Sequence, residues 1–324
     1  MEGTGKIPLI PKGVLRDSRN VFSSMVEKRD RIRYDEKKGL FYHTKREGGE
    51  FMEMKKVWAM YFSPTGGTEK AVKTTAEALA AKLNLPLEVY DWTLPAVREK
   101  EAVFGEGDIV VCGTPVIAGR VPNVLLPYLN EKVKGNGAMA VPVVSFGNRN
   151  FDDALMELRN IMEADGFKTV AGGAFISEHS FSKTLAAGRP DAKDIAVMQE
   201  FGEKIAEKLM SGWEYEGPAY VKGNDPIHPY FKPQDRNGNH IDIRKVKPKV
   251  NDDCCGCGIC AEVCPMGSIN PENTKEYIGI CIKCCACVKK CPSQARYYDD
   301  PGYIYHKEEL EELYERRAEP EYFV

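Results

Sequence analysis

The sequence lacks long hydrophobic runs and an excess of charge of either sign. Across 324 residues, 45 Lys and Arg stand against 48 Asp and Glu, for a net charge of −3. General nucleic-acid binders and proteins of anionic membranes carry a large basic excess, so we expect neither partner. The longest apolar run, near Ala138–Phe146, is broken by Pro142. It falls far short of the roughly 20 residues that span a bilayer, and we expect no membrane span.

Signal-peptide features are also lacking. Residues Met1–Pro11 contain Lys6 and two prolines but no apolar core. We therefore expect a cytoplasmic protein. The length allows two compact domains and an accessory segment.

Cysteine is scarce outside one short block. Ten of the 11 cysteines fall between Cys254 and Cys291, and only Cys112 lies elsewhere. Such crowding in a cytosolic chain indicates metal binding rather than disulfides. Cys112 lies in an apolar strand-like run, and we interpret it as buried packing.

The block contains two similar four-cysteine runs. They read Cys254-x2-Cys257-x2-Cys260-x3-Cys264-Pro265 and Cys281-x2-Cys284-x2-Cys287-x3-Cys291-Pro292. This is the bacterial ferredoxin pattern for two [4Fe–4S] clusters, in which the fourth cysteine of each run ligates the other cluster. One cluster is therefore expected on Cys254, Cys257, Cys260 and Cys291, and the other on Cys281, Cys284, Cys287 and Cys264.

The rival interpretation of the block is a pair of zinc sites. Zinc usually takes paired CxxC knuckles with a long spacer, which the two runs fit poorly. Cys255 and Cys285 each adjoin a ligand, at positions that look equivalent. We expect neither to be a ligand, because each cluster already has four thiolates.

Residues 55–212 alternate strand-like and helical segments. The expected strands are Lys56–Ser63, Leu87–Trp92, Asp108–Thr114, Ala138–Phe146 and Thr169–Ser177. The expected helices are Thr68–Leu83, Val121–Val133, Phe151–Ala164 and Asp191–Met210. Several strands are near-continuous apolar runs, as in parallel sheets buried on both faces. The alternation predicts a doubly wound α/β domain, whose ligand lies beyond the carboxyl ends of the strands.

Loops rich in glycine and hydroxyl groups follow three of these strands. Ser63–Thr68 opens the first helix, where hydroxyls and free N–H groups suit a phosphate dianion. It is neither a Walker loop nor G-x-G-x-x-G, and an ordinary turn remains the alternative for this loop alone. Gly113–Arg120 follows the third strand and Ser145–Asp152 the fourth.

Together the three loops resemble the phosphate loop and the two isoalloxazine-flanking loops of the flavodoxins. With Glu178–Ser182 after the fifth strand and the double cysteine motif, the chain from about Lys55 to Val324 resembles the bacterial flavodoxin–ferredoxin fusion family. The resemblance implies an α/β fold: a flavodoxin-like doubly wound parallel sheet of order 2-1-3-4-5, with a small α+β bacterial-type ferredoxin domain.

The resemblance also implies FMN as a cofactor beside two [4Fe–4S] clusters. Ser63, Thr65, Gly66, Gly67 and Thr68 would bind its phosphate. The ring would be lined by Thr114, Pro115, Val116, Ile117, Gly119, Arg120, Ser145, Phe146, Gly147, Asn148, Arg149, Phe151 and Asp152. Many flavodoxins place a Trp or Tyr against the ring. Here the second loop offers only Val116 and Ile117, which leaves Phe146 or Phe151 for stacking.

His179 is the candidate catalytic residue, because it follows a strand end on the expected flavin face. It could donate a proton to the flavin or to a substrate; the alternative is a structural His bonded to a loop carbonyl. Arg120 and Arg149 could stabilise a reduced flavin or bind an acidic substrate. Solvated loop arginines are the alternative.

We divide the chain into an N-terminal extension (1–54), an FMN-binding domain (55–212), a linker (213–250), a ferredoxin-type domain (251–298) and a C-terminal tail (299–324). A hairpin is expected around Asp35–Gly39, and the linker has room for another. The extension is interpreted as a docking arm or as a solvated cover of its own domain. The tail should form a helix around Lys307–Arg317, with Leu310 and Leu313 inward, and pack back on the protein.

Three functions follow, in order of preference. The first is an electron-transfer flavoprotein that passes electrons between clusters, FMN and a redox partner protein or small-molecule acceptor. The second is an FMN-dependent reductase with its substrate near His179, and the third is a redox sensor or docking protein. The long linker also leaves room for electron transfer across a homodimer.

Overall fold

The computed structural model describes residues 32–35, 40–43 and 52–324. Strands β1 (Ile32–Asp35) and β2 (Leu40–His43) pair antiparallel, as the predicted hairpin requires, and β3 (Met52–Glu53) pairs with β2. The turn residues 36–39 and the rest of the N-terminal extension, 1–31 and 44–51, lie outside the described residues.

The central sheet has seven strands, six of them on one continuous path. Their order is β5 (Leu87–Asp91), β4 (Lys56–Tyr61), β7 (Asp108–Pro115), β9 (Met139–Phe146), β11 (Gly172–Ile176) and β14 (Glu321–Phe323), and β10 (Lys168–Thr169) pairs with β9. The first five are parallel, in the flavodoxin-like order 2-1-3-4-5. This confirms the predicted fold of the domain. The antiparallel edge strand β14 was not predicted.

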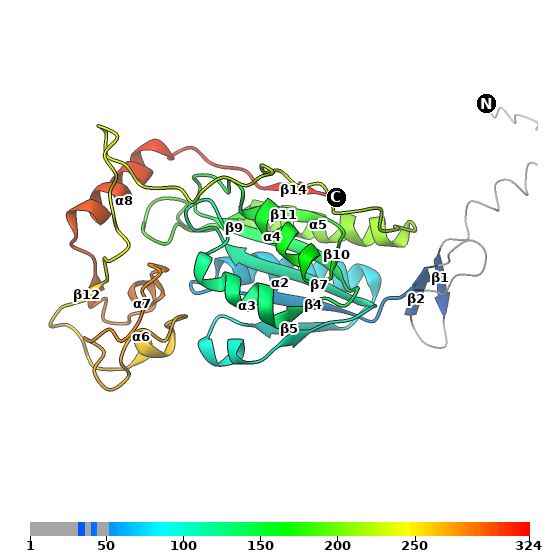
Figure 1. Cartoon of the computed structure of the whole chain (residues 1–324), viewed down its shortest axis with the longest axis horizontal. Helices are drawn as coiled ribbons and strands as arrows, with labels where there is room; N and C mark the ends of the chain where they lie inside the picture. The colour runs from blue at the N-terminus through cyan, green and yellow to red at the C-terminus, as the bar shows by residue number, and fades with distance from the viewer. Residues whose placement is uncertain (1–31, 36–39, 44–51) are drawn as a thin grey trace, which may run out of the picture.

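Helices cover both faces of the sheet (Figure 1). Strand side chains alternate between the faces: Val57 packs with the cluster of α2 (Gly67–Leu83) and α5 (Ala192–Met210). Met60 packs with the cluster of α3 (Leu126–Lys132) and α4 (Ala154–Ala164). Cys112 is buried in this second cluster, as expected of a packing residue. Short strands β6 (Ala102–Val103) and β8 (Val133–Lys134) pair beside the main sheet.

The cysteine-rich lobe lies beyond the carboxyl ends of the parallel strands (Figure 1). It contains two short helices, α6 (Ile259–Glu262) and α7 (Ala286–Lys289), each of which includes the third cysteine of its run. Strands β12 (Lys249–Val250) and β13 (Arg296–Tyr297) pair antiparallel and bring the two ends of the lobe together. Between α5 and β12, an isolated bridge joins Gln234 to His240, a minimal form of the hairpin expected in the linker.

The tail packs back on the protein, as predicted, but its helix is shifted. Helix α8 runs over Pro301–Leu313, and β14 then pairs with β11. Leu310 is 5% exposed, whereas Leu313 is 62% exposed. The inward placement of Leu313 was therefore wrong, because the helix ends there and the chain turns toward the sheet edge.

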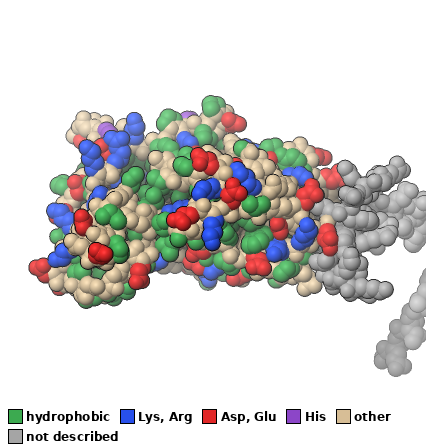
Figure 2. Space-filling model, turned by 60° about the horizontal axis from the view of Figure 1, so that its bottom comes forward, with side chains coloured by type: hydrophobic (Ala, Val, Ile, Leu, Met, Phe, Trp, Pro, Cys, Tyr) green, Lys and Arg blue, Asp and Glu red, His purple; other side chains and the backbone are tan. Residues whose placement is uncertain are grey.

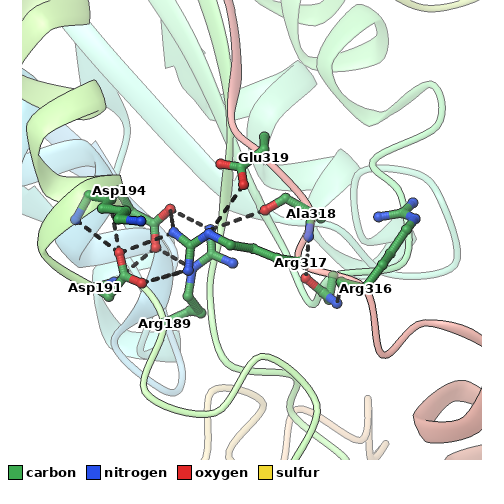
Figure 3. Close-up of polar contacts among 9 residues, drawn as sticks. Arg189, Asp191, Asp194, Arg316, Arg317, Ala318 and Glu319 are labelled. Atoms are coloured by element: carbon green, nitrogen blue, oxygen red, sulfur yellow. Dashed lines mark hydrogen bonds and ion pairs between the residues drawn. The ribbon is translucent and has the colours of Figure 1, made fainter.

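Polar contacts fasten the chain between α8 and β14 (Figure 3). Arg189 pairs with the buried Asp194 and donates to the Ala318 carbonyl at 3.2 Å. Arg317 binds Asp191 at 2.6 Å. Since Asp191 and Asp194 form the capping box of α5, the tail is tied to the start of that helix.

The surface seen in Figure 2 carries Lys and Arg interspersed with Asp and Glu. Neither charge sign dominates this face. No helix in the described segments is both long and apolar enough to cross a membrane.

Candidate functional site

The eight predicted cluster ligands line two small cavities of the lobe. Cys254, Cys257, Cys260 and Cys291 line one, and Cys264, Cys281, Cys284 and Cys287 line the other. Each set crosses between the two runs, as the motif predicts, and each supplies four thiols, the donor set of a [4Fe–4S] cluster. Within the described residues, no three His, Cys, Asp or Glu side chains converge as the ligands of one metal ion would.

The two extra cysteines are not equivalent, contrary to expectation. In the first run, Gly256 and Gly258 have left-handed backbone conformations, with φ of 69° and 79°. The same conformation recurs at Lys283 and Cys285 in the second run, with φ of 57° and 60°. Cys285 therefore corresponds to Gly258, and Cys255 corresponds to Ile282.

The environments of the two extra cysteines differ as well. Cys285 is buried, and its thiol donates to the Lys283 carbonyl at 3.4 Å. Cys255 is exposed. Each lines the cavity of the neighbouring ligands, Cys255 the first and Cys285 the second.

A larger cavity of about 290 Å³ lies between the carboxyl edge of the sheet and the cysteine-rich lobe. The loops after β4, β7, β9 and β11 form its sheet side, with Thr65, Val116, Phe146 and His179 among the lining residues. Ile282, Lys283 and Cys284 close it from the lobe. A residue predicted to ligate the second cluster thus lines the cavity that lies at the predicted flavin position.

The structure brings some of the predicted FMN residues to this cavity and not others. Those that line it are Thr65, Pro115, Val116, Ile117, Gly119, Phe146, Gly147 and Arg149. Ser63, Gly66, Gly67, Thr68, Thr114, Arg120, Ser145, Asn148, Phe151 and Asp152 are not among the lining residues. Ser63, Gly66, Gly67 and Thr68 nonetheless belong to the loop that reaches the cavity through Thr65.

Several of the predicted FMN residues that do not line the cavity instead contact other parts of the protein. Arg120 forms a two-point contact with the buried Glu157, at 2.7 and 2.6 Å. The Asn148 amide donates to the carbonyls of Tyr314 and Arg316, at 2.6 Å each. Phe151 is 1% exposed and packs against Phe146 in the core. Of the two phenylalanines proposed for stacking, only Phe146 therefore reaches the cavity.

The Ser63–Thr68 loop turns from β4 into the start of α2. Gly66 caps α2 in the left-handed region, with φ of 92°, and Ser63 Oγ accepts from Glu69 N at 2.9 Å. A Cβ at Gly67 would lie 2.5 Å from Cβ of Ser177, so only glycine fits there. The first N–H groups of a helix have no intrahelical partner and can bind a phosphate.

One buried hydroxyl near this loop lacks a hydrogen-bond partner in the structure. Thr114, near the carboxyl end of β7, is fully buried, and its Oγ1 contacts no donor or acceptor among the described residues. Buried polar atoms are normally satisfied. The Thr68 and Ser145 hydroxyls, in contrast, pair with each other at 2.6 Å.

His179 lies against the Gly147 backbone at the cavity wall. A Cβ at Gly147 would come within 2.4 Å of Cδ2 of His179. His179 Nδ1 accepts from Phe181 N at 3.2 Å, which places the proton of the neutral ring on Nε2. Burial, reinforced by the Lys289 ammonium, lowers the pKa of His179 to about 4. The ring is thus a neutral hydrogen-bond donor at pH 7, rather than an acid.

Sequence reasoning missed the cavity residues that come from the linker and the tail. Phe231 stacks with His306 of α8, with centroids 6.3 Å apart, and the Arg149 guanidinium lies 4.6 Å above its ring. Arg149 also pairs with Asp152. Neither an isolated Phe in a Pro-rich linker nor a His in a polar helix carries a sequence signal for a cavity on another domain.

Two basic side chains tie the lobe to the α/β domain. Lys289 pairs with Glu178 and donates to the His179 carbonyl at 2.9 Å. Arg98, after β5, donates to the Pro265 carbonyl and to the carbonyls of Trp92 and Thr93, at 2.9 and 2.6 Å for the latter two. The cavity wall formed by Ile282–Cys284 is thereby fixed to the sheet side.

Comparison with known proteins gives structural similarities only. No protein-family model and no curated protein matches the chain. Among solved structures, a flavodoxin from the domain Archaea is 17% identical, with 48% of this chain and 98% of that chain covered and a TM-score of 0.35.

Two further solved structures are similar to the same extent. A Streptococcus pneumoniae flavodoxin is 19% identical, with 47% of this chain and 98% of that chain covered and a TM-score of 0.33. Rubredoxin oxygen:oxidoreductase from Desulfovibrio gigas is 17% identical, with 49% of this chain and 38% of that chain covered and a TM-score of 0.34. At these identities and TM-scores the similarities carry no argument. The flavodoxin-like fold assigned to the domain rests on its strand order.

Proposed function

We propose that the protein is an iron–sulfur flavoprotein that relays electrons between two [4Fe–4S] clusters and FMN and on to a redox partner. One observation carries the proposal: Cys284, a predicted cluster ligand, lines the same cavity as the predicted flavin loops. An electron would then have a path within a single chain. This favours transfer inside one chain over transfer across a homodimer.

The residues present fit both cofactors. The two thiol sets fit the clusters, and the cavity offers an apolar wall of Val116, Ile117 and Phe146 beside the phosphate-type turn at Gly66. When bound, FMN would supply one- and two-electron exchange, and each cluster one-electron exchange. The protein would fix the distance, the potentials and the access of solvent.

The chain's own residues have definite tasks in this proposal. Phe231, His306 and Leu310 close the cavity from the linker and α8 and would keep water out. His179, as a neutral ring, would offer its Nε2–H as a hydrogen-bond donor toward the cavity. Lys289 would hold the lobe against the loop that carries His179.

A reductase that acts on a small molecule is the second candidate. The adjoining polar cavity of about 480 Å³ favours it, because that cavity shares Gly119, Arg149 and Phe231 with the first and could admit a substrate. His179→Gln and Arg149→Gln would then abolish turnover of that substrate and leave reduction of FMN by the clusters intact. If the protein is instead the electron-transfer flavoprotein proposed first, the same variants should pass electrons to a protein acceptor at rates near wild type.

Cofactor analysis of anaerobically purified protein tests the proposal. We expect about eight irons, about eight sulfides and about one FMN per chain. Zinc in place of iron, or a chain that carries clusters but never FMN, would sink it.

A further inference from the structure

The two four-cysteine runs can be compared with each other position by position. When the two runs are aligned on their cysteines, Lys283 stands where the first run has Gly256, and Lys289 stands where it has Glu262. Ile282–Cys284 of the second run line the cavity of about 290 Å³, whereas Cys255–Cys257 of the first run are exposed. The half of the motif that faces the proposed flavin site therefore has three lysines that the other half lacks, because Lys290 also stands where the first run has Val263. Of these three, Lys283 lines the cavity.

Lys283 occupies a position that is unfavourable for its side chain. Its φ of 57° lies in the left-handed region, as does the φ of 69° at the equivalent Gly256. Non-glycine residues are uncommon there because Cβ crowds the backbone. Glycine would relieve the crowding, so backbone geometry does not explain why a lysine stands at this position.

The contacts of Lys283 hold its charge in place. Its ammonium donates to the carbonyls of Cys281 and Arg244, at 2.9 and 2.8 Å, and the residue lines the cavity. In the described part of the chain, the structure shows no carboxylate paired with it. The two arginines of the cavity wall are paired: Arg149 with Asp152 and Arg244 with Asp242.

We propose that Lys283 is a positioning residue that holds an unneutralised positive charge between the second cluster and the flavin cavity, and that this charge stabilises reduced FMN. The inference rests on the proposed function. A fixed cation in a partly water-excluded site favours the redox state with more negative charge next to it. Lys283 would thereby favour reduced over oxidised FMN.

The test is a redox titration of bound FMN, followed by its visible absorbance, in wild-type holoprotein and four variants. Lys283→Gly restores the residue of the first run, and Lys283→Met keeps the stem without the charge. Lys283→Arg keeps the charge. Lys290→Met removes an exposed lysine that lies next to Cys291.

We expect Lys283→Gly and Lys283→Met each to weaken the preference for reduced over oxidised FMN about tenfold, which is about 30 mV for a two-electron couple. Lys283→Arg and Lys290→Met should stay near wild type. Unchanged potentials in both Lys283→Gly and Lys283→Met would overturn the inference. So would an equal shift in Lys290→Met, or a shift in Lys283→Gly alone, which would reflect the backbone.

Failure of the inference about Lys283 can be told apart from failure of the proposed function. A wild-type protein that holds no FMN would contradict the proposed function first. A wild-type protein that holds both cofactors, with potentials indifferent to the charge at Lys283, would contradict only this inference. The Lys283→Gly variant is expected to fold, because its equivalent in the first run is already glycine in the same backbone conformation.

Discussion

At the residue scale, each cysteine is distinguished by its place in the duplicated motif. Cysteine spacing in the sequence predicts eight ligands in two sets of four, and each set lines one cavity of the lobe. The expectation that Cys255 and Cys285 are equivalent was wrong because it compared only their adjacency to a ligand, whereas their positions within the runs differ. The positive φ values at residues 256, 258, 283 and 285 agree with the alignment of the two runs on their cysteines.

Serine substitutions follow from this assignment. Cys264→Ser should remove the second cluster and Cys291→Ser the first, for a loss of about four irons each. Cys255→Ser and Cys285→Ser should keep about eight irons, because neither thiol belongs to a predicted set of four. Iron and sulfide analysis of the four purified variants checks this. Loss of a cluster in Cys285→Ser would mean that the ligand set is wrong.

His179 makes stability depend on pH. Its folded pKa of about 4 lies below the value of about 6.5 in an unfolded chain. Between these values the unfolded chain binds more protons, so the free energy of unfolding rises with pH and levels off above about 6.5. His306, whose pKa is also lowered by burial, adds to the same trend.

We therefore expect His179→Gln to lessen this pH dependence by up to about 1.4 kcal/mol per pH unit between pH 5 and 6. Urea unfolding across this range measures it. The exposed His240 supplies the control, and His240→Gln should keep the wild-type slope. An unaltered slope in His179→Gln would mean that the ring is not held neutral by burial.

At the scale of elements, sequence periodicity placed the parallel strands and their helices to within a few residues. Near-continuous apolar runs such as Met139–Phe146 have few alternatives to a buried strand. β14 escaped prediction because Glu321–Phe323 is short, and its pairing with β11 depends on where the tail returns. For the same reason, the cavity residues Phe231 and His306 could not be predicted.

The tail depends on a buried ion pair at the start of α5. Asp194→Asn would remove the close carboxylate partner of Arg189, which is 8% exposed, and leave it with Asp191 at 3.9 Å. Breaking a buried pair costs about 3–5 kcal/mol, and we expect a loss of this size in the free energy of unfolding. Glu319→Gln, which removes an exposed partner of Arg317, should cost less than about 1 kcal/mol.

Urea unfolding gives both values. Hydrogen exchange at residues 314–323 adds a local readout, since these amides should exchange faster in Asp194→Asn. If the two variants lose the same small amount, the pair does not hold the tail.

At the scale of the whole molecule, linker, lobe and tail converge on one edge of the sheet. The linker contributes Phe231, the lobe Ile282–Cys284 and the tail His306 and Leu310 to one cavity. The extension ends in β3, which pairs with β2 in a separate small sheet and leads directly into the amino end of β4. Its role as a docking arm or a cover stays open, because most of it lies outside the described residues.

The rate of electron transfer from reduced clusters to FMN within the purified protein tests this arrangement most directly. The rate would be followed by flash photoreduction at several protein concentrations. With Cys284 at the wall of the flavin cavity, the account predicts a first-order rate that is independent of protein concentration and faster than reduction of the same FMN by a separate ferredoxin. A rate that rises in proportion to protein concentration, or is no faster than the free ferredoxin achieves, would contradict it.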